Sequence, residues 1–89
     1  MKAVITVVGK DTVGILAKIS SFCANHNVNV TDVTQTILQD MFCMIMLVDT
    51  AEMKLEFTEF SDKLKAYGEE RNLKIHVMHE DIFNSMHRI

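Results

Sequence analysis

Cysteine is scarce in this sequence, and its scarcity excludes a small protein held together by disulfide bonds. Cys23 and Cys43 are the only cysteines, and two are too few for a disulfide framework. Both lie in apolar runs, as small buried side chains do in a reducing compartment. The sequence therefore predicts a cytoplasmic protein.

Clusters of basic residues and long apolar segments are also missing. The formal net charge is −3, and Lys and Arg are scattered along the chain. A nucleic-acid-binding protein needs a positive stripe to neutralise phosphates, so no nucleic-acid partner is expected. No apolar stretch approaches the roughly 20 residues of a membrane span, so no membrane association is expected either.

Apolar surface is what this chain has in excess. Its 89 residues fit a single domain, 1–89, yet 48% of them are hydrophobic. A domain of this size buries only a modest core. Part of the apolar surface is therefore expected to meet another copy of the chain, which predicts a homo-oligomer, with a dimer favoured.

The hydrophobic periodicity divides the chain into strands and helices. Strands are expected at Lys2–Val8, Val28–Gln39, Met41–Asp49 and Leu73–His79. Helices are expected at Val13–Asn27 and Thr50–Arg71, and Glu80–Ile89 is expected to add a short C-terminal helix. The first helix is expected to be capped by Asp11 or Thr12.

The polarity of the strands predicts their order in a sheet. Lys2–Val8 and Met41–Asp49 are apolar on both faces, as central strands are, whereas the other two strands are half polar, as edge strands are. Right-handed crossovers in a β-α-β-β-α-β chain favour a four-stranded antiparallel sheet in the order 4-1-3-2, with both helices on one face. This is an α+β fold of the ferredoxin-like type.

Two local consequences follow from this arrangement. The apolar residues of the second strand change face near Thr31 and Asp32, which predicts a bulge there. Helices on one side only would leave the other face of the inner strands open, and each large apolar side chain left in water forgoes about 1.5–3 kcal/mol. We expect the uncovered face, or a free edge, to contact a second subunit.

The most informative segment joins the first strand to the first helix and runs from Val8 to Leu16. A helix start offers unpaired backbone N–H groups and a partial positive charge, which suit a carboxylate or phosphate. Gly14 would allow a ligand to approach closely, although tight packing of the helix on the sheet explains a glycine equally well. A phosphate loop is excluded, because Ile15 and Leu16 stand where Lys and Ser or Thr are required.

The run from Gly9 to Ile19, followed by Asn29-Val30 and Gln35, resembles an ACT domain. ACT domains are ferredoxin-like modules, often regulatory, that bind amino acids or related small molecules between paired domains, which commonly join into one continuous sheet. The resemblance implies a ligand held by the strand–helix loop of one subunit and the second strand of its partner. The ligand-binding residues so implied are Asp11, Thr12, Val13, Gly14, Ile15, Asn29, Val30 and Gln35.

The same resemblance implies a role for the loop. Asp11 would take a ligand ammonium group, and the backbone amides of Val13, Gly14 and Ile15 would hold its carboxylate. Val13 departs from the family pattern, because many ACT domains have proline there. Gly9 also departs from it, because some amino-acid-binding members carry a polar side chain at that position.

Metal binding and catalysis have less support in the sequence. His76 and His79 point to opposite faces of a strand and cannot easily share an ion. Ser20 and Ser21 have no identifiable His and acid partners, and Cys23 falls on an apolar stripe where its thiol stays protonated. We expect no enzyme activity, no metal and no cofactor.

Two functions remain, beside the weak third option of a small metal-dependent protein. The leading hypothesis is a regulatory small-molecule-binding domain that senses an amino acid or related metabolite at a subunit interface. The alternative is a protein-interaction module that docks on an enzyme or regulator without a metabolite.

Overall fold

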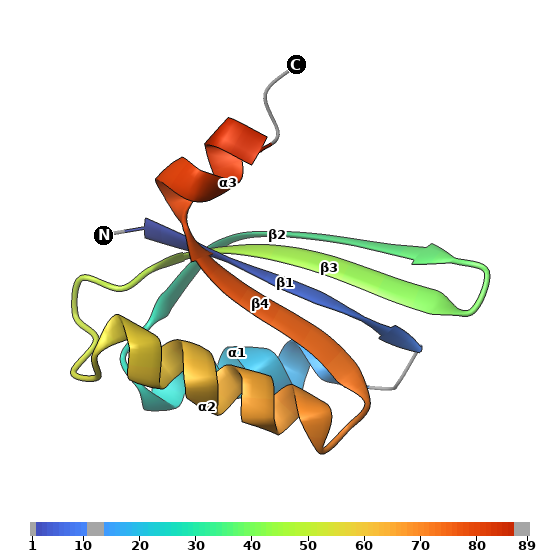
Figure 1. The fold of residues 1–89 in the computed structure, drawn as a ribbon. Helices are drawn as coiled ribbons and strands as arrows, with labels where there is room; N and C mark the ends of the chain where they lie inside the picture. Colours follow the sequence, from blue (N-terminus) through green and yellow to red (C-terminus); the bar gives the residue numbers. More distant parts are fainter. Residues whose placement is uncertain (1, 11–13, 87–89) are drawn as a thin grey trace.

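The chain folds into a four-stranded antiparallel sheet with helices on both of its faces. The computed structural model describes residues 2–10 and 14–86. The elements are β1 (Lys2–Lys10), α1 (Ile15–Asn25), β2 (Asn29–Leu38), β3 (Met41–Asp49), α2 (Phe57–Glu69), β4 (Leu73–His79) and α3 (Glu80–Met86). The strand order is β2-β3-β1-β4, and α1 and α2 lie side by side on one face (Figure 1). The predicted ferredoxin-like fold is confirmed, with α3 added to it.

The two inner strands are the ones whose composition is apolar on both faces. Along β3 the side chains alternate between buried and half-buried, from Phe42 to Val48. Register pairs Met46 with Ile5 of β1, and both side chains are fully buried. The predicted central position of these strands is confirmed, because only a flanked strand can bury one face and half-bury the other.

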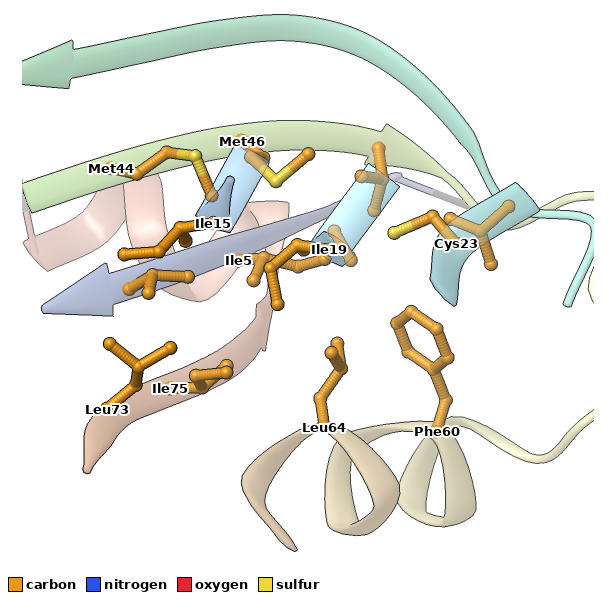
Figure 2. Packing of buried hydrophobic residues seen from close by; sticks show 14 of the residues in the cluster. Ile5, Ile15, Ile19, Cys23, Met44, Met46, Phe60, Leu64, Leu73 and Ile75 are labelled. Atoms are coloured by element: carbon orange, nitrogen blue, oxygen red, sulfur yellow. The ribbon is translucent and has the colours of Figure 1, made fainter. Parts of the chain in front are cut away.

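The core lies between the sheet and the α1–α2 layer. Helix α1 buries residues four apart, Ile15, Ile19 and Cys23, which is one stripe of a helix. Helix α2 contributes Phe60 and Leu64, both 0% exposed. Figure 2 shows these side chains converging on Ile5 and Met46 of the sheet. A single apolar cluster therefore joins the sheet to the α1–α2 layer.

The first helix begins later than predicted. Its N-cap is Gly14 with φ 84°, and its first residue is Ile15. The expectation of a helix starting at Val13 is therefore wrong, and the predicted caps Asp11 and Thr12 lie outside the described residues. The left-handed backbone at Gly14 sets the chain direction, and glycine adopts it with the least strain.

The second helix also begins later, at Phe57 instead of Thr50. Oδ1 of Asp49 accepts a hydrogen bond from the backbone N–H of Ala51 at 2.9 Å, and the N–H of Met53 donates to the carbonyl of Thr50 at 3.0 Å. Such an Asp side-chain turn competes with the helix. Met53 still packs against the core from this loop. Its spacing from Phe57 is that of a helix, although Met53 lies outside the helix.

The face expected to be uncovered is partly covered by α3. This short helix lies on the side of the sheet opposite α1 and α2 (Figure 1). Ala3 and Ile5 of β1 belong to the core cluster, and strand alternation turns Val4, which lies between them, to the opposite face of the sheet. Val4 is nevertheless only 1% exposed. The outer side of α3 itself exposes Ile82 and Met86.

The β2–β3 hairpin extends beyond the helices (Figure 1). The register shifts between Val30 and Asp32, which confirms the predicted bulge. Gln39 turns the chain with φ 60°. Past the end of the helix layer, Ile37 is 58% exposed and Leu38 69% exposed.

None of the helices in the described part of the chain is long and apolar enough to cross a membrane.

Candidate functional site

The N-terminus of α1 is open at Gly14. This residue is exposed, no side chain caps the helix within the described residues, and a Cβ added to it would meet nothing within 4 Å. The glycine is therefore not explained by tight packing of the helix on the sheet. Its positive φ explains it instead, because that conformation is strained in most other residues.

Backbone donors that have no partner among the described residues follow Gly14 directly. The first intrahelical bond runs from the N–H of Lys18 to the carbonyl of Gly14 at 3.0 Å. The N–H groups of Ile15, Leu16 and Ala17 precede it and have no partner within the helix. The buried side chain of Ile15 fixes this turn against the core. A carboxylate placed here would gain hydrogen bonds and the favourable end of the helix dipole.

The structure separates the predicted ligand-binding residues within one chain. Asp11, Thr12 and Val13 lie outside the described residues. Gly14 follows the end of β1, whose last residue Lys10 pairs with Met41 beside the hairpin turn. Asn29 lies at the other end of the sheet, opposite Asp49, which in turn pairs with Lys2. The length of β1, 9 residues, separates the two ends by roughly 30 Å.

The other two predicted residues of β2 differ in their surroundings. Val30 is half-buried and packs against the core cluster, so its side chain is a structural contact. Gln35 is exposed and lies opposite Met44 in the middle of the strand. In the described sheet β2 has a single neighbour, β3, so its outer edge offers backbone groups to another chain.

The hairpin end carries exposed residues that the sequence-based site did not include. Ile37, Leu38 and Met41 are all exposed, and Lys10 forms an ion pair with Asp40 at 3.3 Å between two exposed side chains. The available signal was two adjacent apolar residues directly before a predicted turn. Periodicity assigns such residues to a sheet face without showing that no helix reaches it.

Histidine and cysteine form no shared site in the part of the chain that is described. His76 pairs with Thr6 and His79 with Ala3, so the two histidines are on opposite faces, as predicted. The described residues contain no group of three or more His, Cys, Asp or Glu side chains that could hold a metal. Burial raises the pKa of the Cys23 thiol to about 11, which agrees with the expected protonated state.

Comparison with known proteins identifies the family. Residues 2–78 match the family model of the ACT domain. The chain belongs to the ACT domain family. It is 46% identical to a UPF0237 protein of Listeria innocua over 89 residues, which are 100% of both chains. This ACT domain also resembles a solved ACT domain protein from Streptococcus pneumoniae, with a TM-score of 0.81, 40% identity and 93% of each chain covered.

A more distant likeness extends to larger proteins. The regulatory subunit of aspartate kinase from Thermus thermophilus, solved in its ligand-free form, matches with a TM-score of 0.64 and 23% identity. The match covers 85% of this ACT domain and 49% of that chain. At this identity the likeness concerns the fold alone.

Proposed function

We propose that this ACT domain is a regulatory module that binds an amino acid or related metabolite between two copies of the chain. The observation that carries the proposal is the separation of Gly14 from Asn29. The family resemblance assigns both residues to one ligand, yet they flank α1, whose 11 residues span roughly 16 Å. A small ligand cannot span that distance, so a second copy would supply Asn29.

The free edge of β2 provides a way for a second copy to supply Asn29. If two β2 strands pair antiparallel about a two-fold axis near their middle, Asn29 of the partner subunit reaches the hairpin end of the first. Gly14 lies at that end. The pairing would satisfy the open edge and would bury Ile37 and Leu38, now 58% and 69% exposed, which favours association.

The chemistry of the two surfaces suits an amino acid. The unpaired N–H groups after Gly14 favour a carboxylate, and the exposed side chain of Asn29 offers both an acceptor and donors. The regulatory role is the one that the resemblance to ACT domains implies.

The proposal is tested by screening the proteinogenic amino acids for thermal stabilisation, which grows with ligand concentration as RT ln(1 + [L]/Kd). Ile37→Lys is expected to give a monomer by light scattering and to abolish the stabilisation. Ile82→Lys is the matched control, because Ile82 is 54% exposed on α3 and takes no part in the proposed pairing. Asn29→Ala is expected to leave the dimer intact and to weaken the ligand response.

Two results would contradict the proposal. One is a wild-type chain that stays monomeric at high concentration, and the other is undiminished amino-acid binding by the Ile37→Lys monomer. An intact dimer with no response to any amino acid would favour the alternative, in which the chain docks on an enzyme or regulator.

A further inference from the structure

The two helices that cover the core do not pack closely against each other. No Cα of α1 lies within 8 Å of a Cα of α2, whereas α2 approaches β4 within that distance. Gly68 of α2 explains the preference. A Cβ at this position would lie 2.8 Å from both Cγ1 of Ile75 and the carbonyl oxygen of Leu73. The missing side chain lets α2 lie against β4 and leaves a gap beside α1.

Aromatic side chains fill one half of this gap. Phe22 of α1 lies 5.8 Å from Phe60 and 6.0 Å from Tyr67 of α2, measured between ring centroids. The other half, nearer to Gly14, contains a cavity of about 240 Å³. We call it the interhelix cavity. Its lining residues are Ile15, Lys18, Ile19, Tyr67, Arg71 and Leu73.

The floor of the interhelix cavity is apolar and its rim is cationic. Ile15, Ile19 and Leu73 are at most 5% exposed, so their side chains form a fixed hydrocarbon surface. Lys18 and Arg71 are exposed at the rim. Among the described residues that line the cavity, none is acidic. The two features together match a ligand with one apolar part and one negative group.

Arg71 is held in place at the rim by its neighbours, and it still has free donors. The Arg71 guanidinium lies 3.7 Å from the centre of the Tyr67 ring, and its Nη1 donates to the Tyr67 carbonyl at 3.0 Å. The same Nη1 meets Glu70 Oε2 at 3.3 Å, leaving the other guanidinium N–H groups for a ligand. Lys18 forms no ion pair within residues 2–10 and 14–86.

We propose that the interhelix cavity is a second binding site, for a small branched aliphatic carboxylate. Its hydrocarbon part would pack on Ile19 and Leu73, and its carboxylate would lie between Lys18 and Arg71. The volume corresponds to about eight water molecules and is below the roughly 300 Å³ of pockets for drug-sized ligands. All lining residues come from one chain, so this site does not depend on the proposed dimer.

The test is a methyl and amide NMR titration with 4-methylpentanoate, with 4-methylpentanamide as the neutral analogue of the same shape. The carboxylate is expected to shift the methyl signals of Ile15, Ile19 and Leu73 and to give nuclear Overhauser contacts from its methyl groups to the last two. Because charge-assisted hydrogen bonds are stronger than neutral ones, it should bind at least about tenfold more tightly than the amide.

Variants at the rim separate the contribution of charge to the binding affinity from the contribution of the apolar floor. Lys18→Met and Arg71→Met should each weaken the carboxylate about tenfold while keeping the amide affinity. Lys63→Met, at an exposed position of α2, is the matched control and should change neither. Glu70→Gln removes the competing carboxylate and should tighten binding about two- to fivefold.

Equal affinity for the amide and the carboxylate would overturn the assignment, as would no binding at all or Overhauser contacts elsewhere in the protein. The Ile37→Lys monomer separates this site from the amino-acid site, because it should still bind 4-methylpentanoate with unchanged affinity.

Discussion

The sheet presents similar apolar side chains in two opposite environments. Beneath α1 and α2, Met46 of β3 is 0% exposed. Towards the hairpin on the same strand, Met41 is 39% exposed, and Ile37 on the neighbouring strand is 58% exposed. The helices end before the hairpin does (Figure 1). The covered half therefore stabilises the fold, and the hairpin half leaves apolar surface available for association.

The largest effect expected from this comparison is on the free energy of unfolding. Phe60→Ala removes a fully buried ring and should cost about 3–5 kcal/mol. Ile37→Ala, at the hairpin, should cost less than about 0.5 kcal/mol, as exposed substitutions do. Urea unfolding at low protein concentration measures both. Comparable losses would show that the hairpin is part of the cooperative core.

The two glycines of the helix layer give a second, smaller contrast. Gly68→Ala places a Cβ 2.8 Å from the backbone oxygen of Leu73 and should cost about 2–3 kcal/mol by overpacking. Gly14→Ala meets no atom within 4 Å but must hold φ +84°, which costs about 1 kcal/mol. Gly14→Asn should cost less than Gly14→Ala, because Asn tolerates this conformation. Equal losses in the two Gly14 variants would contradict the conformational explanation.

The cysteines provide the smallest contrast, in the pH dependence of stability. Burial raises the Cys23 pKa from 9.0 to about 11, so the unfolded chain loses this proton first. Stability from Cys23 is therefore complete below pH 9 and falls between pH 9 and 11, by about 1.4 kcal/mol at pH 10.

Unfolding measured at pH 8 and pH 10 tests this expectation. Cys23→Ala should lower the stability at both pH values but reduce the alkaline loss, whereas Cys43→Ala, at a half-buried position, should leave that loss unchanged. An identical alkaline loss in the Cys23→Ala variant would refute the assignment.

Boundaries of elements were harder to predict than their order. Met53 continues the apolar spacing of Phe57 and Phe60, so periodicity placed it in the second helix. A hydrogen bond that the Asp49 side chain accepts from the backbone N–H of Ala51 sets a turn there instead, and nothing in a hydrophobic pattern signals it. The start of α1 was misplaced for a similar reason, since Gly14 caps it through backbone conformation and not through a side chain.

The candidate site was predictable only in part. The loop around Gly14 follows from its place at a strand–helix junction. The interhelix cavity was not foreseen, because Lys18 lies on α1 and Arg71 lies in the turn after α2, far apart in the sequence and with no shared pattern.

By itself the sequence determined the element order, the central strands and the bulge of β2. It could do so because the alternation of polarity along a strand depends on close neighbours in the chain. Tertiary structure alone decided that a cavity separates α1 from α2. It depends on how the elements pack, such as Gly68 of α2 against Ile75 of β4, and packing of that kind leaves no periodic signal.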